Sequence, residues 1–158
     1  MTARNDTAPD IEFLILANHA EAINGMLYLS GGGWTDHRRP VRAGMPPPTS
    51  HLGIAVGICA PWTGQDRTVT LEVDIETMDG TTKLAQVSGG LQMSAPPEEP
   101  PGGAQHAVIA INADVLFPQA GAYRISGRLT NGGSPRYWNF RVHDMPVNQM
   151  PTQQQGNA

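Results

Sequence analysis

Strict alternation of apolar and polar side chains in one segment constrains this chain more than any other feature. The segment is VTLEVDIE, residues 69–76, in which every second residue is Val, Leu or Ile. A period of two places the apolar side chains on one face of a β-strand. The other face carries Glu72, Asp74 and Glu76. This pattern predicts a half-buried antiparallel strand whose acidic face points to water.

Similar patterns recur along the chain. Asp79-Gly80 predicts a hairpin turn after the strand at residues 69–76. Further strand-like segments cover residues 11–17, 25–31, 52–60, 81–87, 90–93, 106–113, 121–129 and 136–142. The earliest is almost continuously apolar, which predicts a central strand, and the link at 18–24 could hold one helical turn. With 18 glycines and 14 prolines for turns, eight or nine short strands predict an all-β, antiparallel β-sandwich. A closed β-barrel is the alternative.

The segment FPQAGAYRISG, residues 117–127, adds a detail to the sandwich. A Pro and a Gly ahead of a Tyr that opens an alternating strand resemble the corner of immunoglobulin-like sandwiches, where the Tyr hydroxyl binds upstream backbone. The resemblance implies that Tyr123 is buried and donates a hydrogen bond to backbone near residues 117–119. The cysteine pair of antibody domains is absent, so only an immunoglobulin-like architecture is implied.

Three consecutive glycines, Gly31, Gly32 and Gly33, follow a predicted strand and precede Trp34. A phosphate-binding loop of the Walker type needs a Lys after its last glycine and a helix behind it. Neither is expected, because Trp-Thr-Asp follows and the proline-rich segment at 40–48 forbids a helix. The glycines therefore predict a bulge or a positive-φ bend, with Trp34 folded back over the sheet edge.

Charge and cysteine content exclude several classes of protein. The net charge is −4, with only 15% charged residues, which argues against a dedicated nucleic-acid-binding protein. The single cysteine, Cys59, permits no internal disulfide and no thiolate cage. No apolar run approaches the ~20 residues of a membrane-spanning helix, and the acidic N-terminal segment is unlike a signal peptide. We expect a protein of the cytoplasm, or of the virion if a phage encodes it, without membrane contact.

The stretch LANHAEAINGMLYLSGGGWT, residues 16–35, resembles the start of an uncharacterised family of small all-β bacterial and phage-associated proteins. Its strongest motif, Gly-x-Leu-Tyr-x-x-Gly-Gly-Gly-Trp, covers residues 25–34. A second similar segment is IAVGICAPWT, residues 54–63, where a strand ends in Pro-Trp. The resemblance implies an all-β domain of unknown function, and it implies no catalytic or ligand-binding residues.

Candidate catalytic groups are sparse. The sequence has no His-Glu-x-x-His metal motif and no Gly-x-Ser-x-Gly nucleophile elbow. Cys59 continues a strand on its face of small residues, which indicates a buried packing residue. The acidic residues at 72–76 could serve as paired glycosidase carboxylates, but a solvated strand face is the commoner explanation. We therefore expect no enzyme activity, no catalytic residues, no cofactor and no tightly bound metal.

Two sets of side chains are candidates for binding. Three arginines in a proline- and glycine-rich loop could contact an acidic partner surface: Arg38, Arg39 and Arg42. Trp34 and Trp62 stand at strand ends, where indole rings could stack on a sugar or another small ligand. Trp138, in contrast, alternates in phase with Phe140 and Val142 and is expected in the core.

The polar chain ends complete the prediction of function. We divide the chain into an N-terminal arm (1–9), a β-sandwich domain (10–145) and a C-terminal arm (146–158). Ordering an arm residue costs roughly 1–2 kcal/mol, so other protein chains must supply contacts, with Val147 and Met150 as anchors. The predicted function is a non-enzymatic structural module that docks onto a larger protein assembly, in one concrete form a phage-type accessory or capsid decoration protein. The alternative is a β-sandwich that binds a carbohydrate or another small ligand through its loop tryptophans.

Overall fold

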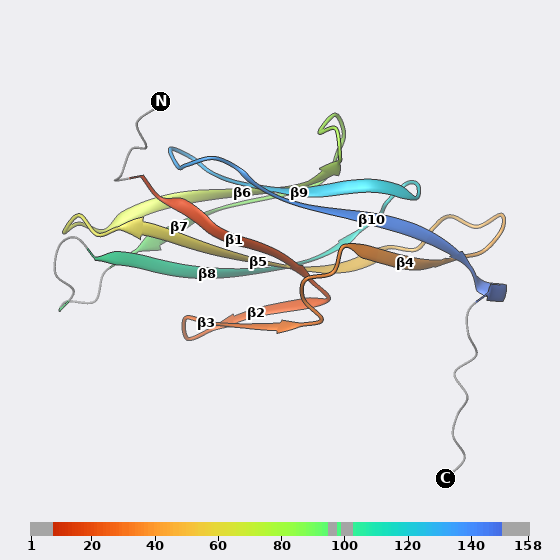
Figure 1. Ribbon diagram of the computed structural model, residues 1–158, viewed down its shortest axis with the longest axis horizontal. Coiled ribbons are helices and arrows are strands. Elements are labelled where there is room, and N and C mark those ends of the chain that lie inside the picture. Colours follow the sequence, from red (N-terminus) through yellow and green to blue (C-terminus); the bar gives the residue numbers. More distant parts are fainter. Residues whose placement is uncertain (1–7, 95–97, 99–102, 150–158) are drawn as a thin grey trace, which may run out of the picture.

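The computed structural model describes residues 8–94, 98 and 103–149, and these residues fold almost entirely into β-strands (Figure 1). The described residues form ten strands and one short 3-10 helix. Their bounds are β1 (Asp10–Ala17), β2 (His19–Ile23), β3 (Met26–Ser30), β4 (Asp36–Val41), β5 (Ser50–Pro61), β6 (Arg67–Thr77), β7 (Lys83–Met93), β8 (Ala104–Val115), β9 (Gly121–Leu129), β10 (Arg136–Pro146) and η1 (Val147–Gln149). The count exceeds the expected eight or nine because the sequence suggested a helical link at β2 and a loop at β4.

Two sheets of the described residues enclose the core, and β2 and β3 form a third, two-stranded sheet. The smaller of the two core sheets has the strand order β1-β5-β8 and the larger has the order β4-β10-β9-β6-β7. Neighbouring strands run antiparallel except β4 and β10, which are parallel and make the larger sheet mixed. Alternate side chains of both sheets meet in one hydrophobic core. The all-β sandwich is therefore confirmed, and the sheets do not close into a barrel.

The core follows the alternation seen in the sequence. The inward residues of β5 are at most 1% exposed: Leu52, Ile54, Val56 and Ile58. Near one end of the core, the rings of Phe117, Tyr123 and Phe140 pack together with centroids 4.7–6.0 Å apart. The Tyr123 hydroxyl donates a hydrogen bond of 2.6 Å to the carbonyl oxygen of Gln119. The predicted tyrosine corner is confirmed, and Trp138 packs against the core as expected.

The apolar segment at 11–17 lies in β1, and the prediction that it forms a central strand is wrong. β1 lies at the edge of the smaller sheet, and β5 is its central strand. β1 is apolar on both faces for a different reason. Leu14 and Leu16 are buried in the core, whereas Phe13 covers Gly57 on the outer face, where any Cβ would collide with the Phe13 ring.

β2 and β3 form a hairpin on the outer face of the smaller sheet, in place of the suggested helical turn (Figure 1). Asn24 and Gly25 at its tip have φ angles of 51° and 74°, the geometry of a two-residue hairpin turn. The hairpin crosses β5 at Gly53, where an added Cβ would lie 2.7 Å from the backbone of β2. Asn112 of β8 anchors it, because its side chain donates to the Ala20 carbonyl at 2.8 Å and accepts from the Ala20 N–H at 3.1 Å.

The three glycines after β3 form a turn, as predicted. Gly31 and Gly33 have φ angles of 58° and 86°, whereas Gly32 between them has no positive φ. The Gly33 N–H donates to the Leu16 carbonyl at 2.7 Å, which returns the chain to β1. Trp34 then packs against the core, with its ring 5.8 Å from that of Phe140.

Candidate functional site

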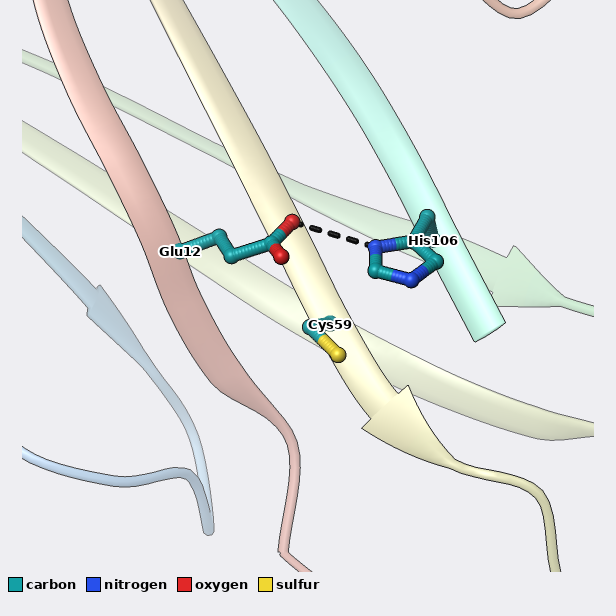
Figure 2. Close-up of side chains that lie close together, drawn as sticks. All are labelled: Glu12, Cys59 and His106. Carbon is teal, nitrogen blue, oxygen red and sulfur yellow. Dashed lines mark hydrogen bonds and ion pairs between the residues drawn. The ribbon is translucent and has the colours of Figure 1, made fainter. Parts of the chain in front are cut away.

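A glutamate, a cysteine and a histidine from three neighbouring strands come together on the outer face of the smaller sheet (Figure 2). They are Glu12 of β1, Cys59 of β5 and His106 of β8. A carboxylate oxygen, the Sγ atom and a ring nitrogen all lie within 4.8 Å of one another. Nδ1 of His106 lies 3.1 Å from Oε2 of Glu12. We call these three residues the Glu–Cys–His cluster.

Strand register builds this cluster. Cys59 lies opposite His106 in the β5–β8 pair, so both side chains point to the same side of the sheet. Between β1 and β5 the register shifts between Ile11 and Phe13, and Glu12 is the extra residue. Such a bulge re-aims a side chain. Ile11 is buried in the core, while Glu12 extends over β5 toward His106 (Figure 2).

The surroundings of the cysteine are acidic. Partial burial raises the pKa of the Cys59 thiol, and the carboxylates of Glu12 and Asp10 raise it further. A thiol in such surroundings stays protonated and is a poor nucleophile by itself. The same two carboxylates attract a cation. The cluster therefore has the chemistry of a set of ligands for an ion, and not that of an activated cysteine.

The prediction that Cys59 is a buried packing residue is wrong. Its side chain is partly exposed next to Glu12 and His106. The alternation correctly separated Cys59 from the core face of β5, but alternation does not reveal what covers the opposite face. Histidine spacing does not indicate the site either, because its ligand atoms come from three strands that are neighbours in the sheet but far apart in the sequence. These three residues could have been predicted as neighbours only from the register of the paired strands.

The sequence suggested that the acidic face of β6 points to water, and this prediction is wrong. Asp74 and Glu76 are only 1% and 5% exposed. Cations from the two flanking strands cover them. The ion pairs are Arg128 with Glu72, Arg128 with Asp74 at 2.9 Å, Lys83 with Asp74 at 3.1 Å, and Arg124 with Glu76 at 2.8 Å. These carboxylates belong to one ion network, here called the β6 network, in which each of them is paired with a cation. Both cations of Asp74 contact its Oδ2 atom, and its Oδ1 atom is buried without a hydrogen-bond partner.

The three arginines that the sequence suggested as one binding loop have different surroundings. They belong to β4 and the residue after it, and β4 pairs with β10. Arg39 is 2% exposed, and its guanidinium donates to Asp144 at 2.6 Å and to the Phe117 carbonyl. Its predicted role as a partner contact is wrong, since the strand turns its side chain inward. Arg38 and Arg42 are exposed.

An apolar groove lies beside β4, where β10 ends. It has a volume of about 360 Å³ and is lined by Pro40, Arg42, Met45, Pro46, Pro48 and Val147. Two of the suggested partner-binding residues, Arg42 and Val147, thus share one surface. Met150 lies outside the described residues, as does most of each predicted arm. Pro146, placed in the C-terminal arm by the sequence, is the last residue of β10 and pairs with Val41.

The two candidate tryptophans are each half-buried and lie far apart. Trp34 follows Gly33, whose N–H donates a hydrogen bond to the carbonyl of Leu16. Leu16 in turn pairs with Ile54 of β5. Trp62 comes eight residues after Ile54, just beyond the end of β5. At about 3.3 Å per strand residue this separation is about 26 Å. The two indoles therefore cannot contact one small ligand together.

The chain matches a known protein family. Residues 12–135 match DUF6941, a family of unknown function, and the chain belongs to this family. The expectation of an uncharacterised family is confirmed, and the matched span contains the whole Glu–Cys–His cluster. The phage association stays a prediction. No curated protein matches the chain. In the part of the chain that the structure describes, no helix has the length and apolar character needed to cross a membrane.

Proposed function

We propose that this protein is a non-enzymatic interaction module that docks onto a larger protein assembly through its β2–β3 hairpin. The observation that carries the proposal is an apolar patch near the hairpin tip. Ile23, Met26 and Tyr28 are 48%, 55% and 49% exposed, and we call them the hairpin patch. Apolar side chains gathered on a projecting element are typical of protein interaction sites.

The register of the hairpin directs this patch away from the domain. Ile23 pairs with Met26, and Glu21 pairs with Tyr28, so these four side chains share one face. Ala20 lies on the other face and is buried against the smaller sheet. The hairpin is a sheet of two strands on its own, and strand edges of this kind accept a further strand from a partner.

The chemistry of the surface favours a protein partner over a nucleic acid. The hairpin patch is apolar with Glu21 beside it, and the net charge of the chain is −4. The groove with Arg42 and Val147 supplies a second apolar surface for the same kind of partner. Docking through the two chain arms, and the concrete form of a phage-type accessory or decoration protein, stay predictions of the sequence.

Binding of a carbohydrate through the loop tryptophans is less well supported. Trp34 and Trp62 do not share a surface, and Trp34 is engaged by the rings of His37 and Phe140 at 5.6 and 5.8 Å. A sugar-binding platform needs an open aromatic face. The hairpin patch is the more exposed surface.

The experiment is a comparison of captured partners in the native host. Tagged full-length protein, the Met26→Glu variant and the Leu116→Glu variant are purified from cell extracts, and co-purifying proteins are quantified by mass spectrometry. The partner is then purified and its affinity for each form is measured. We expect Met26→Glu to weaken binding at least roughly 10-fold. The substitution places a charge where the bound partner would cover an apolar side chain.

Leu116→Glu is the matched control, because Leu116 is also a large apolar residue, 51% exposed, that lies outside the hairpin. It should bind the partner as the wild type does. A purified partner that binds Met26→Glu and wild type equally well would contradict docking through the hairpin patch. Equal loss in both variants would point to general destabilisation and would also contradict it.

A further inference from the structure

We infer that the Glu–Cys–His cluster is a binding site for Zn²⁺, with Glu12, Cys59 and His106 as its protein ligands. A carboxylate, a thiolate and an imidazole are the three ligand types that zinc uses in proteins. Mg²⁺ and Ca²⁺ are hard ions that prefer oxygen ligands. The inference is independent of docking through the hairpin patch, and it reverses the expectation from sequence that the chain binds no metal.

The distances suit a tetrahedral ion after a small adjustment. Zinc–ligand bonds of about 2.0–2.3 Å place the ligand atoms of a tetrahedron about 3.3–3.8 Å apart. Here the three ligand atoms lie within 4.8 Å of one another. Closing the set around an ion requires shifts of about 1 Å, which side-chain rotation at the surface provides. The backbone positions are fixed by hydrogen-bonded strands, a rigid support for a ligand set.

Binding exchanges the present contacts for coordination. The 3.1 Å hydrogen bond between His106 and Glu12 gives way to one bond from each residue to the ion. Cys59 releases its thiol proton to solvent and binds as the thiolate, so the charges of thiolate and carboxylate balance those of Zn²⁺. Asp10 lies opposite Cys59 in the β1–β5 pair and adds a further negative charge near the ion.

The site is accessible and keeps an open position. The side chains of His106 and Glu12 are 57% and 47% exposed, so an ion enters without opening the fold. Three protein ligands leave the fourth tetrahedral position to water from the solvent side. Because the ligands lie at the surface, their replacement should leave the core of the sandwich intact.

The test is calorimetric titration of the reduced, untagged full chain with Zn²⁺, with the stoichiometry checked by native mass spectrometry. We expect one zinc per chain, with binding roughly 100-fold weaker in Cys59→Ser and in His106→Ala, and weakened in the same direction in Glu12→Gln. A large excess of Mg²⁺ should not compete. Titration with Co²⁺ should produce a thiolate-to-cobalt absorption band in the wild type and none in Cys59→Ser.

The matched control is His143→Ala. His143 on β10 lies 2.7 Å from Asp36 in an exposed histidine–carboxylate pair like that of His106 and Glu12, but on the larger sheet. This variant should bind zinc as the wild type does. The inference is overturned if the wild type binds no stoichiometric zinc, if Cys59→Ser binds as tightly as the wild type, or if His143→Ala loses as much. Thermal melts followed by circular dichroism confirm that each variant is folded.

Discussion

Two clusters of polar side chains, one on the outer face of each sheet, differ in how their charges are paired. On the larger sheet, each carboxylate of the β6 network contacts a cation from a flanking strand, and Asp74 and Glu76 are almost fully buried. On the smaller sheet, the Glu–Cys–His cluster is open to solvent, with one contact between His106 and Glu12. The carboxylates of the β6 network are neutralised by cations of their own sheet, whereas an open group of ligand atoms can still accept an ion. The smaller sheet is therefore the face on which ligand atoms are available.

The faces also differ in what covers them. The smaller sheet carries glycines on the outer face of β5, and these leave room for the ring of Phe13 over Gly57 and for the β2 backbone over Gly53. The larger sheet is covered by its own long side chains, and Arg124 also lies 4.6 Å from the ring centre of Tyr137. The projecting hairpin and the ligand cluster are therefore both features of the glycine-containing face.

The largest effect should come from opening the β6 network. Arg128→Met removes the cation shared by Glu72 and Asp74, and Asp74 is 1% exposed. We expect a loss of about 2–3 kcal/mol in the free energy of unfolding, measured by urea denaturation. Removing one partner of a fully buried ion pair usually costs about 3–5 kcal/mol. The cost is lower here because Arg128 is itself 43% exposed and because Asp74 keeps its contact with Lys83.

Arg38→Met is the control for this prediction, because Arg38 is an exposed arginine on β4 of the same sheet. Its replacement should change the free energy of unfolding by less than about 0.5 kcal/mol. Similar losses in the two variants would show that the network stabilises no more than an ordinary surface charge, and the contrast between the two faces would then disappear.

The second effect tests the packing of the hairpin on the smaller sheet. Gly53→Ala places a methyl group 2.7 Å from the backbone of β2, so the hairpin must move away from β5. We expect a destabilisation of about 2 kcal/mol, as for other overpacked sites. Amide hydrogen exchange should become faster in β2 and β3 than in the rest of the domain.

Gly89→Ala provides the comparison, since a Cβ at Gly89 of β7 would meet nothing within 4 Å. That variant should be neutral or slightly stabilised, because alanine reduces the freedom of the unfolded chain. A Gly53→Ala protein as stable as Gly89→Ala would show that the hairpin does not rest on β5 as described.

The third effect concerns the anchor of the hairpin. Asn112→Ala removes two hydrogen bonds to the backbone of Ala20. We expect a loss of about 1 kcal/mol in the free energy of unfolding, because water can replace part of these bonds at a partly buried position. Asn139→Ala, at an exposed site on β10, should change less. If both variants lose the same amount, Asn112 is not an anchor.

Local alternation explains which parts of this fold the sequence could predict. β5, β6 and β9 were predictable because a period of two places their apolar residues on one face, and Tyr123 was predictable from the Pro and Gly before it. Hairpin β2–β3 was harder, because its strands are polar or half-exposed, although Asn24-Gly25 is a strong turn signal. β4 contains Pro40 and three charged residues, so its parallel pairing with β10 has no local pattern.

The candidate site depended on contacts that no local pattern encodes. Asp74 and Glu76 alternate as solvated residues do, and their burial follows only from arginines on β9 and a lysine on β7. Glu12 reaches Cys59 and His106 because of a register shift in β1, and a single sequence shows neither the shift nor the neighbouring strands. Side-chain burial and ligand clusters are properties of strand pairing.

The smallest expected effect is a difference in pH dependence between two tight turns, one in the larger sheet and one in the β2–β3 hairpin. The turn between β6 and β7 uses Asp79, whose pKa is lowered from 3.8 to about 2, first by the hydroxyl of Thr77 and then by the N–H and hydroxyl of Thr81. A lowered pKa in the folded state means that the unfolded chain takes up the proton more readily. The stabilisation is therefore complete above about pH 4 and is lost as the pH falls toward about 2.

Asp79→Asn isolates this charge, because the amide keeps an oxygen acceptor for Thr81 but does not titrate. We expect the wild type to be slightly more stable than Asp79→Asn at neutral pH, and the difference to vanish as the pH falls from about 4 to about 2. The hairpin turn at Asn24-Gly25 has no carboxylate, so Asn24→Ala should change stability by the same amount at every pH in this range, through its positive φ. A constant difference for Asp79→Asn would mean that the turn of the larger sheet depends on its geometry alone, as the turn of the projecting hairpin does.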